Sequence, residues 1–168
     1  MTMQVDKLTT EYAVDPLGID EPRPRLGWTF KPGGRGKRQS AYRVLAASTP
    51  ESLARLAGDL WDSGKVYSED SQHVPYAGKP LRSGQTVYWK VQAWDEAGQA
   101  SPWSEQARWT MGLLSQEEWQ AGWIDVRRAS VKTPDLPPPA YLRRTFGLGG
   151  EIRRATVYST ALGDYELY

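Results

Sequence analysis

Two pairs of adjacent acidic residues are the first positions in this sequence with the chemistry for proton transfer. Glu69 and Asp70 lie in the polar stretch "SED", and Glu117 and Glu118 lie in "QEEW". Paired carboxyls act as general acid and base when a concave site holds one of them at a raised pKa. Both stretches read as a polar turn or a domain junction, where Asp and Glu are most simply explained as solvated charge. We therefore predict no catalytic residue in this chain.

Metal and cofactor chemistry has equally little support in the sequence. His73 is the only histidine and cysteine is absent, so a metal site or a Ser-His-Asp triad would have to be built around His73. The Ser and Asp of "DSQHV" lie in a strand-like segment, whose neighbouring side chains point apart. The stretch "PGGRGK" lacks the full spacing and the following helix of a phosphate-binding loop. We predict no metal and no cofactor.

Aromatic side chains with polar edges are the unusual feature of the composition, because eight Trp and nine Tyr accompany only two Phe. Such side chains stack on sugar rings or bury large areas in cores and interfaces. Our candidates for an interface or for sugar stacking are Trp61, Tyr88, Trp94, Trp103, Trp119 and Trp123. The i, i+4 spacing of the last two predicts that they share a face and bury against the first domain.

Charge and hydropathy limit the classes of partner. The 21 basic and 20 acidic residues give a formal net charge of +1, which offers no electrostatic attraction for nucleic acid or an anionic membrane. The start of the chain lacks the apolar stretch of a signal peptide, and no apolar run approaches the ~18 residues of a membrane span. We expect a cytoplasmic protein whose partners include neither nucleic acid nor a membrane.

The elements that position the candidate side chains read as short strands, because β-rich runs are divided by Gly, Pro, Asp and Ser at the spacing of a sandwich or barrel. In "RLGWTF" the period of two places Leu26, Trp28 and Phe30 on one buried face. The Gly-rich stretch "KPGGRGKRQ" after it reads as a hairpin loop. In "TPESLARLAGDLW" we expect one short helix of about two turns, with Thr49 as N-cap and Gly58 as its stop.

The stretch "TVYWKVQAWDEAGQASPWS" is the clearest strand. Alternation places one set of side chains in the core, namely Val87, Trp89, Val91 and Ala93. The other set, which mixes charge with aromatic rings, faces water or a neighbouring domain and comprises Tyr88, Lys90, Gln92 and Trp94. The stretch resembles the penultimate strand and following turn of a fibronectin type III domain at Val87, Trp89, Val91, Ala93, Gly98 and Ser101.

Six longer sequence motifs occur in a specific order along the chain: "DPLGIDEPRPRLGW", "GDLWDSGKV", "YAGKPLRSGQTVYWKVQAWDEAG", "EEWQAGWI", "AYLRRTF" and "IRRATVYSTALGDYELY". In this order they resemble the N-terminal region of bacterial α-L-rhamnosidases of glycoside hydrolase family 78. The resemblance implies a fibronectin-like domain, then a jelly-roll carbohydrate-binding-like domain. A distant (α/α)6 barrel would carry inverting hydrolysis of terminal α-L-rhamnose, which needs two carboxyls about 6.5 to 9.5 Å apart.

We therefore predict an all-β protein with a fibronectin type III or immunoglobulin-like sandwich at 1–112. The linker and truncated start of a jelly-roll-like β unit would occupy 113–168, with strands in "AYLRRTFGL" and "RRATVYSTALGDYELY". The expected function is that of a non-catalytic fragment, inactive alone, which packs against and positions downstream domains of the same polypeptide. The alternatives are an independent carbohydrate-binding module for rhamnosides and a protein-interaction module. Open β edges also predict self-association.

Overall fold

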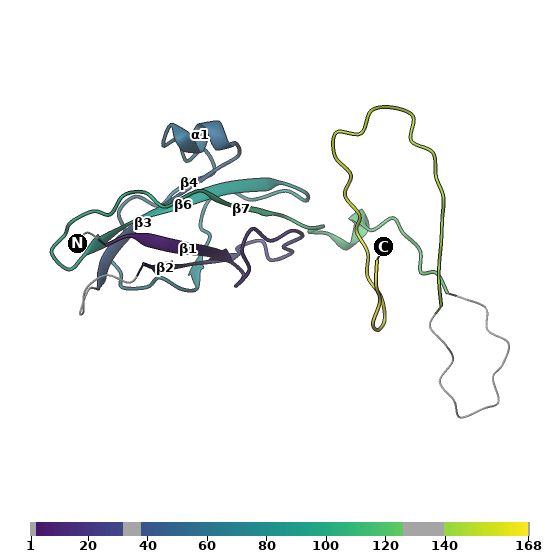
Figure 1. The fold of residues 1–168 in the computed structure, drawn as a ribbon, viewed down its shortest axis with the longest axis horizontal. Coiled ribbons are helices and arrows are strands. Elements are labelled where there is room, and N and C mark those ends of the chain that lie inside the picture. The colour runs from purple at the N-terminus through teal and green to yellow at the C-terminus, as the bar shows by residue number, and fades with distance from the viewer. Residues whose placement is uncertain (1–2, 32–37, 126–139, 168) are drawn as a thin grey trace, which may run out of the picture. The chain divides into compact units, whose positions relative to one another are not determined.

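The computed structural model describes residues 3–31, 38–125 and 140–167 (Figure 1). The chain divides into two compact units, Met1–Ala121 and Gly122–Tyr168, and each is described by itself. Most of the basic Gly-rich loop and of the Pro-rich linker "TPDLPPPA" lies outside the described residues.

The first unit is a sandwich of two antiparallel sheets, which confirms the all-β class. One sheet has the order β1-β2-β5 and consists of β1 (Val5–Thr10), β2 (Arg25–Phe30) and β5 (Val74–Pro75). The other has the order β4-β3-β6-β7 and consists of β4 (Trp61–Asp62), β3 (Gln39–Ala47), β6 (Thr86–Asp95) and β7 (Ala107–Thr110). β2 and β3 belong to different sheets and do not pair with each other. The predicted hairpin at this point is therefore wrong.

Alternation along β6 builds the centre of the core. Val87, Trp89, Val91 and Ala93 are fully buried, as predicted, and they alternate with half-buried side chains. The buried indole of Trp89 meets that of Trp109 edge to face, with ring centroids 6.4 Å apart. Such aromatic pairs stabilise a core beyond the area that they bury.

One buried polar side chain links the two sheets. The indole Nε1 of Trp28, on β2, donates a hydrogen bond of 2.9 Å to Oε1 of Gln39, on β3. The Gln39 amide in turn donates to the carbonyls of Ser68 at 3.1 Å and Asp70 at 2.6 Å. Buried polar groups are costly unless they are paired, so this network fixes how the sheets meet.

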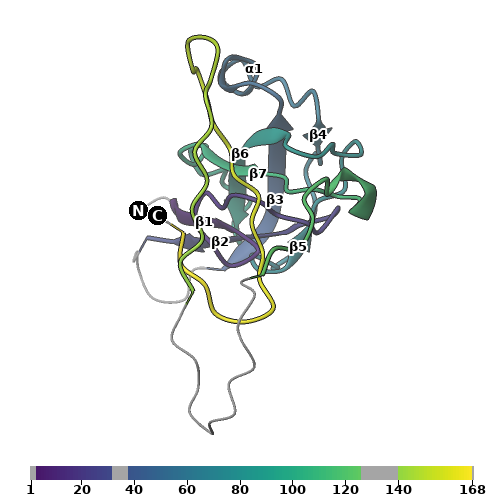
Figure 2. The same ribbon diagram turned by 90° about the vertical axis from the view of Figure 1, so that its right-hand side faces the viewer.

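The short helix α1 (Pro50–Ala54) lies on the outer side of the four-stranded sheet, away from β1 and β2, in both ribbon views (Figures 1 and 2). Thr49 caps it as predicted, accepting a hydrogen bond from the Ser52 backbone N–H at 3.1 Å. Leu53 packs on Leu45 and Ala47, which buries this end of the outer face. The helix ends well before the expected stop, because Leu56 adopts a left-handed φ of 60°.

The connection between β1 and β2 covers the open edge of β7. The Asp15 carboxylate accepts a hydrogen bond from the Arg108 backbone N–H at 2.8 Å. The Pro16 carbonyl accepts one from the Thr110 N–H at 3.0 Å, and the Ile19 N–H donates to the Thr110 carbonyl at 3.0 Å. In Figure 1 this connection, in dark purple, lies beside the end of β7, where the chain leaves the sandwich.

In the second unit, the described residues form neither helix nor strand. The two strands that alternation predicts in 141–167 are therefore not formed in this structure, and the physical reason is that their side chains find no core. Tyr141, Phe146, Val157 and Leu162 are all exposed. A local contact at the Gly163 bend joins Tyr165 Oη and the Ser159 carbonyl at 3.2 Å. A strand without a buried face has little to hold it.

Candidate functional site

The outer face of β3 and β6 brings together three of the six predicted aromatic residues. Tyr88 pairs across the strands with Ala47, and Trp94 pairs with Ala41, so both rings lie on the face opposite the core. Trp103 follows β6 and packs with Tyr88 against the cluster beneath α1. All three side chains are half-buried. We call Tyr88, Trp94 and Trp103, with the cations that contact them, the outer aromatic face.

Cationic side chains cover the rings of the outer aromatic face. Lys65 Nζ lies 4.6 Å from the centroid of Trp94, and Lys90 Nζ lies 5.3 Å from the centroid of Trp103. The Arg43 guanidinium lies 5.9 Å from the same Trp103 ring. A cation over a Trp face is held by the quadrupole of the ring. A sugar that stacked on Trp103 would compete with two cations for the faces of one ring.

Arg43 is the cation of this face that an ion pair holds in place. Arg43 binds Asp62 through two hydrogen bonds, of 2.9 Å from Nε and 2.6 Å from the terminal nitrogen. This pairing raises the pKa of Arg43 and lowers that of the Asp62 carboxyl. Burial lowers the pKa of Lys90. The face therefore combines the Arg43–Asp62 ion pair with cation–aromatic contacts, and it is not an open apolar platform.

The other three candidate residues lie elsewhere. Trp61 pairs with Ala46, so its ring turns toward the core, where it meets Tyr76 edge to face at 5.4 Å. The 3-10 helix η1 covers only Gln116–Glu118, and Trp119 is extended with φ of −78° and ψ of 101°. Trp119 and Trp123 therefore do not share a helical turn, so the predicted i, i+4 geometry is wrong. Trp119 is 40% exposed, and Trp123 belongs to the second unit.

The acidic candidates are held in local turns. Asp70 accepts a hydrogen bond of 2.8 Å from the Ser68 hydroxyl. Glu118 closes a capping box with Ser115 and accepts a hydrogen bond of 2.5 Å from Ser83 Oγ, and these hydrogen bonds lower the pKa of its carboxyl. A general acid needs the opposite shift. Across the described part of the chain, no three His, Cys, Asp or Glu side chains gather as they would around a metal ion.

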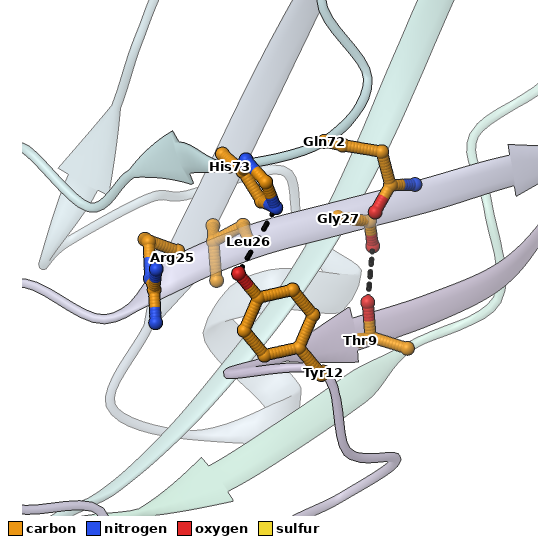
Figure 3. Close-up of a pocket in the computed structure, with 7 residues that line it drawn as sticks. All are labelled: Thr9, Tyr12, Arg25, Leu26, Gly27, Gln72 and His73. Carbon is orange, nitrogen blue, oxygen red and sulfur yellow. Dashed lines mark hydrogen bonds between the residues drawn. The ribbon is translucent and has the colours of Figure 1, made fainter.

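A polar cluster at one end of the sandwich was missed by the sequence reasoning (Figure 3). Tyr12 Oη lies 3.0 Å from Nε2 of His73, and the two rings meet edge to face at 5.4 Å. The Arg25 guanidinium lies 5.0 Å from the centroid of the Tyr12 ring and binds the Glu11 carboxylate at 2.6 Å. That hydrogen bond lowers the pKa of Glu11. A small pocket opens here, lined by Thr9, Tyr12, Arg25, Leu26, Gly27, Gln72 and His73.

Backbone conformation is the second mark of this cluster. Glu11, Tyr12 and His73 adopt left-handed φ angles of 46°, 66° and 58°. Residues other than Gly and Asn rarely take this conformation, and it persists only where the surrounding structure enforces it. The sequence carries no sign of it, because "TEYA" contains none of the Gly or Asn typical of such tight turns.

Within the described residues, no helix combines the length and apolar character needed to cross a membrane.

Comparison with known proteins confirms the resemblance to the N-terminal region of α-L-rhamnosidases that the ordered sequence motifs indicated. An α-L-rhamnosidase of Streptomyces avermitilis is 40% identical over 97% of this chain, and one of Formosa agariphila is 35% identical over 99%. The chain spans only 17% and 19% of the length of these two relatives.

Solved structures give the same answer for the fold. The Streptomyces avermitilis α-L-rhamnosidase complexed with L-rhamnose has a TM-score of 0.70 and 43% identity, over 75% of this chain and 12% of that one. The α-L-rhamnosidase from Dictyoglumus thermophilum has a TM-score of 0.70 and 34% identity, over 74% of this chain and 14% of that one. Residues 5–115 match the family described as Rha78A-like, N-terminal immunoglobulin domain. The chain thus belongs to the family of Rha78A-like N-terminal immunoglobulin domains.

Proposed function

We propose that this chain is a non-catalytic module of an α-L-rhamnosidase-like glycoside hydrolase. Its role is to pack against and position the downstream domains of an enzyme that removes terminal α-L-rhamnose. The observation that carries the proposal is the asymmetry of the match. Relatives named α-L-rhamnosidase cover 97% and 99% of this chain, whereas the chain spans 17% and 19% of them. Most of such a polypeptide therefore lies outside the matched module.

The carboxyl groups of the first unit support a role without catalysis. Inverting glycoside hydrolysis needs one carboxylic acid whose pKa is raised. The described carboxyls with clearly shifted pKa values all shift downward, and they are Glu11, Asp59, Asp62 and Glu118. A downward shift keeps each of them ionised at neutral pH, so none is poised to donate a proton to a glycosidic oxygen.

The competing proposal is an independent carbohydrate-binding module that uses the outer aromatic face. Trp94 and Trp103 are the rings in its favour, because both lie outside the core. The cations over these rings count against it, since Lys65 and Lys90 occupy the faces on which a sugar would stack. Tryptophan fluorescence of the purified chain, titrated with L-rhamnose, tests this directly. We expect no saturable change up to millimolar sugar, and a saturable change that Trp103→Ala abolishes would establish the module.

Activity measurements test the main proposal. The native reading frame is followed beyond the codon for Tyr168, and the full-length product and the chain 1–168 are purified and supplied with an aryl α-L-rhamnoside. We expect release of aryl alcohol by the full-length protein and none above a buffer blank by the chain alone. Release by the chain alone would overturn the non-catalytic role. A stop codon directly after Tyr168 would overturn the multidomain role.

A further inference from the structure

We infer that the outer aromatic face binds an acidic saccharide, whose uronate carboxylates pair with the ammonium groups of Lys65 and Lys90. The inference rests on the proposed function and adds to it a class of ligand. Such a ligand makes use of the same cations that a neutral sugar would have to displace from the rings. The face would thereby hold an acidic stretch of a glycan to the module, without any chemistry on it.

The pairing of the strands places three cations of this face side by side. The antiparallel pairing of β3 with β6 sets Lys90 diagonally across from Arg43 on the outer face. On the other side of β3, Val66 and Tyr42 form an antiparallel bridge with backbone hydrogen bonds of 2.8 and 2.9 Å. Lys65 therefore lies opposite Arg43. We call Lys65, Arg43 and Lys90 the cationic row.

Two members of the cationic row lack a counter-charge. The Asp62 carboxylate is already taken by the two hydrogen bonds from Arg43. Within the described residues, neither Lys65 nor Lys90 forms an ion pair, and each lies against an aromatic ring instead. Burial lowers the pKa of Lys90, and no carboxylate offsets that shift. A carboxylate bound across the row would supply the missing counter-charge.

The rings beside the cationic row give the ligand a second kind of contact. Lys65 Nζ lies 4.6 Å from the centroid of Trp94 and 5.1 Å from that of Tyr67. A lysine has a flexible four-carbon stem, so its ammonium can move from a ring to a carboxylate and leave the ring face open. The sugar ring that carries the carboxylate can then stack on the indole.

Charge and rings together favour a saccharide over the other polyanions. An acidic peptide would use the cations of the row but has little use for the flat faces of Trp94 and Trp103. Nucleic acid would use both, but the formal net charge of +1 gives the chain no wider attraction for a row of phosphates. Rings with an apolar face and a polar edge match the C–H and hydroxyl groups of a sugar.

Isothermal titration of the chain 1–168 with tetragalacturonate tests the inference, and its fully methyl-esterified form is the neutral control. We expect saturable binding of the acid with a Kd below about 1 mM and none of the ester. Salt at about 1 M should weaken this binding, because it screens charges beyond about 3 Å. No binding of the acid, or equal binding of the ester, would overturn the inference. Equal binding of tetraglutamate or of a short oligothymidylate would overturn the assignment to a saccharide.

Charge variants provide the second readout. Lys65→Gln/Lys90→Gln should weaken binding of tetragalacturonate by about tenfold, the effect expected for the loss of two exposed ion pairs. Lys65→Arg/Lys90→Arg keeps both charges and should retain binding. Lys7→Gln removes an exposed charge from β1, in the other sheet, and should bind as the wild type does. Unchanged binding by the Gln double variant would refute the role of the cationic row.

The fate of this inference can be separated from that of the proposed function. If the full-length protein releases aryl alcohol from an aryl α-L-rhamnoside but the chain 1–168 binds no tetragalacturonate, the binding surface fails and the proposed function stands. If the chain binds tetragalacturonate but the full-length protein hydrolyses no rhamnoside, the proposed function fails and the binding surface stands.

Discussion

Tyr12 and His73 hold each other across the end of the sandwich, with the hydroxyl 3.0 Å from Nε2, although 61 positions separate them in the chain. Both residues have left-handed φ angles, of 66° and 58°. The contact therefore joins two strained turns, one after β1 and one just before β5. Each turn presents its ring to the other, and neither ring is part of the core.

Strain at Tyr12 predicts an unusual order of stability. Tyr12→Gly and Tyr12→Ala both remove the ring, but only Gly adopts a φ of 66° at little cost. We expect the Gly variant to be more stable than the Ala variant by about 1 kcal/mol in urea unfolding. Tyr67 is the control, because it has no left-handed φ and the order of its Gly and Ala variants should reverse. An Ala variant at position 12 as stable as the Gly variant would refute the strain.

The Glu11–Arg25 pair predicts a dependence of stability on pH. Hydrogen bonding from Arg25 lowers the pKa of Glu11, so the folded chain favours the ionised carboxylate. This stabilisation is complete above the unfolded pKa of about 4.3 and is lost as the pH falls through the lowered folded value. Glu11→Gln should therefore cost about 0.5 to 1 kcal/mol at neutral pH, a range that allows for solvent screening of the exposed Arg25.

Urea unfolding of wild type and Glu11→Gln at neutral pH and at about pH 3 measures this difference. We expect the gap between the two proteins to shrink at the lower pH, because protonation of Glu11 removes the charge that Arg25 stabilises. Asp20→Asn, at another exposed position of the same connection, controls for general charge effects. A gap that widens in acid would show that the sign is wrong.

The hydrogen bonds of Gln39, which link the two sheets, allow the cost of breaking that link to be predicted. Gln39→Leu leaves the buried Trp28 indole N–H without its acceptor, and the carbonyls of Ser68 and Asp70 without their donor. The loss should be about 2 to 3 kcal/mol, the usual penalty for orphaned buried polar groups. Gln92→Leu removes a single hydrogen bond, of 2.9 Å to the Ser101 carbonyl, from a half-buried site. Chemical denaturation should show a much smaller loss of unfolding free energy for Gln92→Leu than for Gln39→Leu. Equal losses in the two variants would show that Gln39 does not link the sheets.

We expect Gly78 and Gly27 to differ in how well they tolerate substitution by Ala, which adds a methyl group. At Gly78, a Cβ would lie 2.4 Å from Tyr76 Oη and 2.5 Å from the Leu60 backbone carbonyl, which cannot move away. At Gly27, the near atoms are side-chain ends, Gln72 Oε1 at 2.6 Å and Thr9 Oγ1 at 2.9 Å. Gly78→Ala should cost about 3 kcal/mol and Gly27→Ala about 1 kcal/mol. Thermal unfolding of the two variants measures the order, and the reverse order would contradict this packing.

The strands of the sandwich were predictable where a single period of two carried the information. Strand β6 follows its alternation over its whole length, and Thr49 and Pro50 announce the start of α1 by local chemistry alone. The end of α1 was not predictable, since it depends on a left-handed φ at Leu56 that no residue type indicates. The assignment of β2 and β3 to different sheets was likewise not predicted, because it depends on long-range packing.

In the candidate sites too, features set by local sequence were predictable and features set by long-range packing were not. The outward direction of Tyr88 and Trp94 follows from alternation, so it was predicted. Alternation also placed Lys90 on this face, whereas Lys65 and Arg43 come from a loop and from β3, and no local pattern in β6 reports their contacts. The contact between Tyr12 and His73 was beyond sequence reasoning for the same reason. The strands expected in 141–167 are absent from the described residues, because alternation specifies a face, and a face forms a strand only when something covers it.

The parallel course of the connection and β7 has a mechanical consequence. Ile19 and Met111 form a parallel bridge, and the hydrogen bonds of Thr110 and Gly112 to Pro16 and Ile19 lie side by side. A force that pulls the start of the chain away from its end loads these bonds in shear, so they share the tension and must break together. We expect the sandwich to resist stretching until this clamp fails, and then to open in one step.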